Sequence, residues 1–235
     1  MKNISIMQPT FLPYVGFFAL IDYVDEFIFL DNVQFDKRSW QQRNYLKGVS
    51  EKEIINIPVL TKGKFDQKIL DVEIDYTNFK INKLINKIKI NYKKSKYLDL
   101  YINDIEIIFK KKHVKLVNLN SELILKFCEY LNIKTEISFA SKLLGDKKLV
   151  KIDLLKEISK IKKTNNYIST IGSKDYLKSL KKFPDTEISI KFFSFDDVKY
   201  FQLGNNFVPN LSIIDLLFNE GPNSINILRK YFKII

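Results

Sequence analysis

The start of the chain constrains the fold most strongly. Two short apolar runs, "NISIM" at 3–7 and "EFIFLD" at 26–31, are typical of buried strands. Between them, Pro13 to Tyr23 has a helical pattern, with proline near its start, where a missing N–H costs nothing. Two strands joined through a helix form a βαβ unit and pair in parallel. The sequence therefore predicts an α/β fold.

The rest of the pattern extends this prediction. We expect strands at 54–60, 69–75, 134–141, 165–170 and 188–195, and helices near 149–162, 211–220 and 223–232. Between about 79 and 135, apolar residues recur with helical spacing. We therefore predict one domain, 1–235, with a mostly parallel sheet of Rossmann-like βαβ units and a helical subdomain or insertion at about 79–135.

Composition narrows the classes of function. The chain has 235 residues and is 46% hydrophobic, enough for one large core. No apolar run approaches the roughly 20 residues that span a bilayer, and no secretory signal is visible, so we expect a cytoplasmic protein without a membrane span. The single cysteine, Cys128, is predicted to be a buried inert thiol, and the single histidine, His113, to be exposed. We expect neither a metal site nor a cofactor.

The net charge of +12 is concentrated in two segments. Residues 79–118 and 147–182 each carry 11 lysines and three acids. These lysines mostly occupy the polar positions of amphipathic helices, so most of the charge is interpreted as a solvated face. Docking of tRNA or of an acidic carrier protein is the alternative.

Two polar loops follow the first two predicted strands. Because ligands in an open parallel sheet bind beyond the carboxyl ends of the strands, these loops are expected to face each other. In the first loop, "QPTFLPYVG", Gln8 supplies an amide, Pro9 and Pro13 stiffen the backbone, and Phe11 and Tyr14 are candidate walls. The loop is typical of a rigid, neutral pocket wall, although a plain structural turn explains it equally well.

The second loop favours a site. Only three of the 39 basic residues are arginines, and two of them, Arg38 and Arg43, flank the only tryptophan, Trp40. The planar fork of arginine suits bidentate binding of phosphate or carboxylate. Candidate ligand-binding neighbours in this loop are Gln34, Lys37 and Asn44, and Asp31 ends the preceding strand. The alternative is a structural ion pair between an aspartate and an arginine.

A third candidate lies far along the chain. Asp215 falls beside the apolar stripe of the predicted helix in "LSIIDLLFNEG". An acid in this position is either held by a backbone or arginine partner or faces a site. We assign it a structural or orienting role. No glycine-rich phosphate loop, zinc spacing or nucleophile elbow is present in the sequence.

These motifs resemble the WbqC-like family of bacterial surface-polysaccharide proteins. The resemblance runs essentially from end to end and is carried by "MQPTFLPYVGFF", "DEFIFLDNVQFDKRSWQQRN", "INIPV", "NNYISTIGSKDYL" and "FQLGNNFVPNLSIIDLLFNEG". Many relatives have histidine where this chain has Met7, so a chemical role for that histidine does not carry over. The resemblance implies a bacterial O-antigen biosynthesis enzyme that attaches an acyl or aminoacyl group, such as glycyl, to the amino group of an amino-deoxysugar.

The residues and the resemblance together give a hypothesis for the site. Asp31 is the candidate general base or amine positioner, and Arg38 and Arg43 would hold the phosphates of a nucleotide sugar. Gln8 and Asn44 would orient the sugar or the carbonyl. The acyl donor stays open between aminoacyl-tRNA, a carrier protein and a small thioester. The rivals are a nucleotidyl- or adenylate-forming enzyme on the same fold and a non-catalytic glycan or nucleic-acid binding protein.

Overall fold

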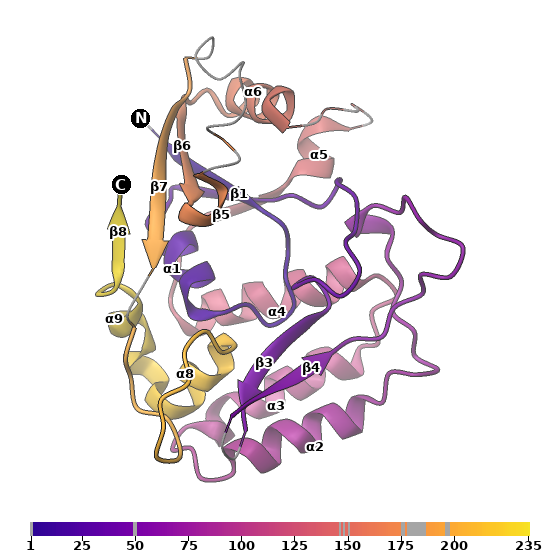
Figure 1. The fold of residues 1–235 in the computed structure, drawn as a ribbon, viewed down its shortest axis with the longest axis vertical. Coiled ribbons are helices and arrows are strands. Elements are labelled where there is room, and N and C mark those ends of the chain that lie inside the picture. Colours follow the sequence, from indigo (N-terminus) through magenta and orange to yellow (C-terminus); the bar gives the residue numbers. More distant parts are fainter. Residues whose placement is uncertain are drawn as a thin grey trace.

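The computed structural model describes residues 2–48, 51–145, 147, 149, 151–174, 177, 187–195 and 198–235. It is a mixed α/β structure, as predicted (Figure 1). Parts of the second lysine-rich segment and of the motif "NNYISTIGSKDYL" lie outside the described residues.

A six-stranded sheet has the order β5-β2-β1-β6-β7-β8. Its strands are β1 (Asn3–Met7), β2 (Glu26–Phe29), β5 (Glu136–Phe139), β6 (Asn166–Thr170), β7 (Ser189–Phe195) and β8 (Phe232–Ile234). All neighbours pair in parallel except β7 and β8, which are antiparallel. The first unit runs from β1 through helix α1 (Val15–Tyr23) into β2, with Ile4 opposite Glu26 and Met7 opposite Phe29. The predicted βαβ start and mostly parallel sheet are confirmed.

Helices cover the sheet on both faces because its strands alternate between two apolar clusters. Ile4, Ile6 and Ile28 pack with helices α5 (Ala140–Leu144) and α6 (Lys151–Lys162) on one face. Phe27 and Phe29 pack toward α1 on the other, in a cluster that continues into the remaining helices. These are α2 (Ile81–Tyr92), α3 (Leu98–Lys110), α4 (Leu116–Tyr130), α8 (Ile213–Glu220) and α9 (Ser224–Leu228). The apolar helical faces predicted for α2, α3 and α4 are buried, as their spacing implied.

A separate antiparallel ribbon crosses the lower half of the view in Figure 1. It consists of β3 (Arg43–Lys47) and β4 (Lys52–Asn56), with Tyr45 opposite Ile54. β3 is not predicted from the sequence, because "RNYLK" is mostly polar. Its inward residues, Asn44 and Leu46, are buried, whereas the opposite face carries polar and aromatic side chains.

One predicted strand is shorter than expected, and the prediction of another is wrong. The strand expected at 54–60 ends at Asn56, because Pro58 has no N–H to continue a ladder. The segment at 69–75 forms a 3₁₀ turn, η1 (Ile69–Asp71), followed by isolated bridges at Glu73 and Ile74. The apolar residues of this segment face the core, but the segment does not pair with another strand along its length.

The last predicted helix, 223–232, is also shorter. It begins after the 3₁₀ turn η4 (Gly221–Asn223), ends at Leu228, and is followed by β8. Phe232 of β8 stacks on Phe193 with ring centroids 5.4 Å apart, which draws the terminus onto the sheet edge. Within the part of the chain that the structure describes, no helix combines the length and apolarity needed to cross a bilayer.

Candidate functional site

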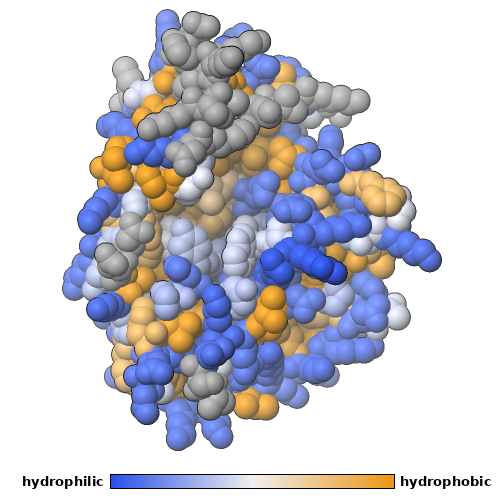
Figure 2. All heavy atoms as spheres, viewed as in Figure 1, coloured by the Kyte–Doolittle hydropathy of each residue, from blue (hydrophilic) through white to orange (hydrophobic). Residues whose placement is uncertain are grey.

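A cavity of about 460 Å³ opens at the carboxyl edge of the sheet. The sequence order of the strands reverses here, since β2 and β5 lie on one side of β1 and β6 and β7 on the other. Ligands of open α/β sheets bind at such a reversal. The cavity is lined by Met7, Thr10, Tyr14, Phe17, Trp40, Asn44, Thr170, Ile171, Gly172, Phe193, Phe195 and Asn210. Figure 2 shows the surface hollowed between β7 and the ribbon, where side chains of intermediate hydropathy, drawn pale, gather.

The first loop is held rigidly by buried amides. Asn44 Nδ2 donates to the carbonyls of Phe11 (3.1 Å) and Leu12 (2.7 Å), where Leu12 has a positive φ of 42°. Asn120 Nδ2 of α4 donates to the carbonyls of Pro9 (3.1 Å) and Gln41 (2.8 Å). The loop is therefore a fixed wall, as its two prolines predicted.

Aromatic residues of this loop divide between core and cavity. Phe11 is fully buried against Phe109, 6.3 Å between ring centroids, so its predicted place in the pocket wall is wrong. Tyr14 does line the cavity, and its ring lies over Gly16. A Cβ at Gly16 would come within 2.5 Å of the Tyr14 ring, so the glycine makes room for this wall.

The three arginines have different surroundings. Arg229 makes a two-bond ion pair with Asp22, at 2.7 and 2.8 Å. Arg43 belongs to none of the ion pairs found among the described residues; its Nε is buried without a hydrogen-bond partner, and its guanidinium lies 6.0 Å from the Trp40 ring centroid. Trp40 is half exposed at the cavity rim. Arg43 is thus a cation with unused donors that neighbours Trp40 and Asn44 of the cavity lining but is not part of that lining itself.

Arg38 is not brought into the cavity lining. It lies on an exposed turn with φ 59°, and Gln42 accepts a hydrogen bond from its backbone N–H at 3.2 Å. Lys37 and Gln34 are likewise exposed on this loop, Lys37 over Phe65 and Gln34 donating to the Phe65 carbonyl. The structure therefore gathers Tyr14, Trp40 and Asn44 around the cavity and leaves these three residues outside its lining.

Asp31 and Gln8 also lie outside the cavity lining, each with a protein partner. The two carboxylate oxygens of Asp31 accept from the backbone N–H (2.9 Å) and the hydroxyl (2.5 Å) of Ser141, at the start of α5. The side-chain amide oxygen of Gln8, Oε1, accepts a hydrogen bond from Gln41 Nε2 at 2.7 Å. This bond orients the amide of Gln8 and leaves its NH₂ group available as a donor.

Asp215 is fully buried in the first turn of α8, outside the cavity lining. Tyr200 donates a 2.7 Å hydrogen bond to its Oδ2, and Gln202 in turn donates to the Tyr200 hydroxyl at 3.1 Å. Burial raises the pKa of the Asp215 carboxyl to about 6, although the Tyr200 hydroxyl opposes this shift. Asp215 thus anchors the 198–210 loop, whose Asn210 lines the cavity.

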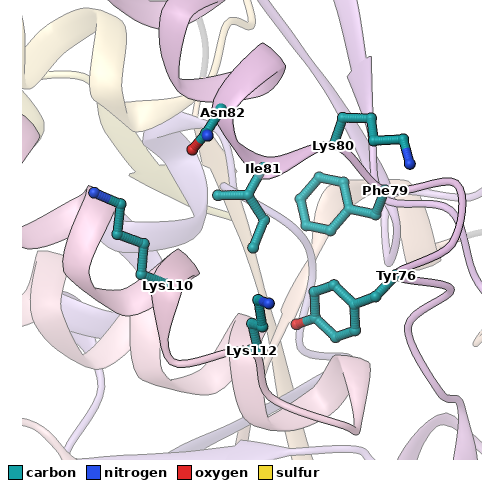
Figure 3. A pocket seen from close by; sticks show the side chains of 7 residues that line it. All are labelled: Tyr76, Phe79, Lys80, Ile81, Asn82, Lys110 and Lys112. Carbon is teal, nitrogen blue, oxygen red and sulfur yellow. The ribbon is translucent and has the colours of Figure 1, made fainter.

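A second cavity, of about 380 Å³, lies where α2 begins and α3 ends. Its lining includes Lys80, Lys110 and Lys112 (Figure 3). Lys80 and Lys110 point to opposite sides of Ile81 in this view, and Lys110 pairs with Glu106 at 2.6 Å. The lysines do not converge on one ligand position, which favours the interpretation of this segment as a solvated face.

The remaining candidates for reactive chemistry are structural. Cys128 is buried, and burial raises the pKa of its thiol to about 12, as expected for an inert residue. His113 is partly buried and bonds to Glu122 at 2.5 Å, so the prediction of a freely exposed histidine is wrong. Among the described residues, no group of three or more histidine, cysteine, aspartate or glutamate side chains could hold a metal ion.

Comparison with known proteins places the chain in a family. The model of the WbqC-like protein family matches residues 8–227. The chain belongs to the WbqC-like protein family. A protein described as uncharacterised, Rv1507c of Mycobacterium tuberculosis, is 31% identical to this WbqC-like protein over 233 residues, covering 97% of this chain and 98% of the relative. No solved structure matches this chain.

The match covers every cavity residue except Met7. Several of the residues that the structure adds were missed by sequence reasoning: Thr10, Thr170, Gly172, Phe193 and Asn210. The predicted strands at 165–170 and 188–195 could have pointed to those on β6 and β7, because their carboxyl ends meet the same edge. Nothing in the sequence pattern alone brings Asn210 to this WbqC-like site.

Proposed function

We propose that this WbqC-like protein is a transferase that attaches an acyl or aminoacyl group to the amino group of a nucleotide-linked amino-deoxysugar. The observation that carries the proposal is the cavity at the strand-order reversal, with an uncommitted arginine at its side. Aromatic walls from Tyr14, Phe193 and Phe195 suit a nucleobase, and the amide of Asn210 and the remaining Oδ1 lone pair of Asn44 suit sugar hydroxyls.

The reaction is an acyl transfer to nitrogen. The sugar amine attacks the activated carbonyl carbon, a C–N bond forms, and the bond from that carbon to the donor oxygen or sulfur breaks. The amine proton ends on the leaving group. Asp31 stays our candidate for positioning the amine although it lies outside the cavity lining: each carboxylate oxygen that accepts from Ser141 keeps a further lone pair.

Thermal protection by a panel of nucleotide sugars tests the acceptor. We expect a nucleotide amino sugar to raise the melting temperature more than its hydroxy counterpart, starting from UDP-glucosamine, UDP-glucose and UDP. At a hundredfold excess over the dissociation constant, stabilisation is about 2.7 kcal/mol. An unchanged melting temperature across the panel, or equal protection by free nucleotide, would reject the amino-sugar acceptor and favour an adenylate-forming enzyme, which ATP consumption would reveal.

Arg43→Lys is expected to weaken the protecting ligand roughly tenfold, about 1.5 kcal/mol, since lysine keeps the charge and loses the planar fork. Titration calorimetry of the folded variant measures this change. Lys83→Gln, on the exposed side of α2, is the control and should leave affinity unchanged. Wild-type affinity in Arg43→Lys for every panel ligand that binds the native protein contradicts the assignment.

A further inference from the structure

The outer face of the β3–β4 ribbon carries two neighbouring aromatic rings flanked by two cations, of which the proposed acceptor site uses only Arg43 and Trp40. We call this set the ribbon face: Trp40, Arg43, Tyr45, Lys52 and Ile54. The Arg43 guanidinium lies 6.0 Å from the Trp40 ring centroid, Trp40 meets Tyr45 edge-on at 5.7 Å, and Lys52 Nζ lies 4.5 Å from the Tyr45 ring centroid.

The ribbon face is exposed on one side of the strand pair. Trp40 is 51% and Ile54 47% exposed, whereas the opposite side, with Leu46 and Ile55, is buried in the core. Residues that alternate along a strand share one face, which places Arg43 and Tyr45 together, and Ile54 lies directly across from Tyr45. An exposed tryptophan next to an exposed isoleucine, flanked by cations, is a typical recognition surface.

The chemistry of the ribbon face fits single-stranded nucleic acid. Bases stack on aromatic rings and phosphates bind the cations beside those rings, without a need for base-specific contacts. Tyr45 and Lys52 lie outside the cavity lining, so a ligand in the cavity leaves them free. An acidic protein would use the cations and leave the half-exposed Trp40 ring and the partly exposed Tyr45 ring without a stacking partner.

The position of the ribbon face connects it to the cavity. Trp40 belongs to both, since it also lines the cavity at its rim. A single-stranded nucleic acid stacked on Tyr45 and Trp40 would therefore end at the cavity mouth. This is where the proposed reaction needs the carbonyl of its donor.

We propose, building on the proposed function, that the ribbon face binds single-stranded RNA and that the acyl donor is an RNA carrying an aminoacyl ester on its 3′-terminal ribose. The sugar amine attacks the ester carbonyl, the C–N bond forms, and the C–O bond to the ribose breaks. The ribose hydroxyl leaves with the proton that the amine loses, so no other co-reactant is needed.

Fluorescence of Trp40 tests the proposal directly, because this chain has a single tryptophan. An unstructured RNA of about seven nucleotides is expected to quench its emission, with an affinity that falls steeply as salt rises. Saturation with the panel ligand that gives the largest thermal shift should leave an RNA-dependent quench in place, since the acceptor shares only Arg43 and Trp40 with the ribbon face and leaves Tyr45 and Lys52 to the RNA.

Two variants and a matched control locate the binding surface. Tyr45→Leu and Lys52→Gln are each expected to weaken RNA binding about tenfold while leaving thermal protection by the nucleotide sugar unchanged. Lys96→Gln is the control, because Lys96 lies 5.0 Å from the Tyr97 ring centroid in a similar pair outside the ribbon face.

The outcomes separate this inference from the proposed function. Three results would each overturn the inference. They are unchanged Trp40 emission when RNA is added, displacement of the RNA by the nucleotide sugar, and a loss of RNA affinity in Lys96→Gln equal to that in Tyr45→Leu and Lys52→Gln. Quenching by an acidic carrier protein and not by RNA would overturn it in favour of a carrier donor. In each case the thermal panel still decides the acceptor. Transfer of labelled amino acid from RNA to the amino sugar would support both.

Discussion

Replacing Glu26 by alanine is expected to lower the free energy of unfolding by about 3 kcal/mol, because it breaks a buried ion-pair cluster. Glu26 is fully buried at the amino end of β2, pairs with Lys2 (2.8 Å) and Lys162, and accepts from the Ser138 hydroxyl at 2.9 Å. Burial alone would raise the pKa of this carboxyl, but hydrogen bonds from Lys162, Lys2 and Ser138 hold the pKa below 4.5. Urea unfolding at pH 7 measures the loss.

Glu106→Ala is a matched control for this variant. Glu106 also pairs with two lysines, Lys89 and Lys110, but it lies on the helical surface with 19% of its side chain exposed. An exposed pair contributes about 1 kcal/mol or less. Because the folded pKa of Glu26 is lowered, its contribution is present above pH 4.5 and is lost as pH falls through the folded value. Equal losses in the two variants would contradict the buried-cluster account.

The pattern of residues predicted the sheet better than it predicted the site. The runs at 3–7 and 26–31 were short, apolar and separated by a helical segment, and these local features already specify a parallel unit. β3 was missed because only one side of "RNYLK" faces the core, and Lys47 on the other side is buried under the 198–210 loop. Burial of that kind depends on a distant segment and leaves no local trace.

The candidate site was likewise predicted only in part, because local sequence identifies residues but not their tertiary contacts. Tyr14, Trp40 and Asn44 were identified by their loops, and the structure places them around the cavity. Asn44 does more than line it, since its amide also holds the first loop at Phe11 and Leu12. A sequence shows that an asparagine is present but not which carbonyls it meets.

The scarcity of arginine was an informative signal of a different type. Composition alone could not tell Arg229, which is fully paired with Asp22, from Arg43, which is not. Tertiary contacts make that distinction, because an ion-pair partner 207 positions away in the chain is invisible to local pattern. Arg43 and the cavity beside it are therefore the features that support the proposed function.

Asp215→Asn is expected to stabilise the protein by about 2 kcal/mol at pH 7.5. Burial raises the pKa of the Asp215 carboxyl from 3.8 to about 6, so the folded state binds this proton more tightly than the unfolded state. Its favourable contribution is complete below about pH 4 and is lost as pH rises to about 6. Above that, ionisation of the buried group costs about 2–3 kcal/mol, which the neutral amide avoids.

The pH profile of urea unfolding checks this prediction. Wild type should lose stability between about pH 4 and 6 from this group, and Asp215→Asn should not. The Glu26 effect lies below pH 4.5, so the two groups are separated by their pH ranges. Tyr200→Phe is the companion variant: it removes a bond to the ionised carboxylate and should therefore destabilise the protein more at pH 7.5 than at pH 5.

A functional consequence is expected beside the gain in stability. The 198–210 loop is fastened to Asp215 through Tyr200, and Gln202 closes it by bonding both the N–H (2.8 Å) and the carbonyl (2.9 Å) of Val208. An amide in place of the carboxylate accepts a weaker bond from Tyr200, so Asn210 should hold the nucleotide sugar less firmly. Thermal protection by that ligand should fall in Asp215→Asn while the free protein melts higher. A variant that melts lower than wild type at pH 7.5 would show that the buried charge is stabilised by its surroundings and is not held at a cost in stability.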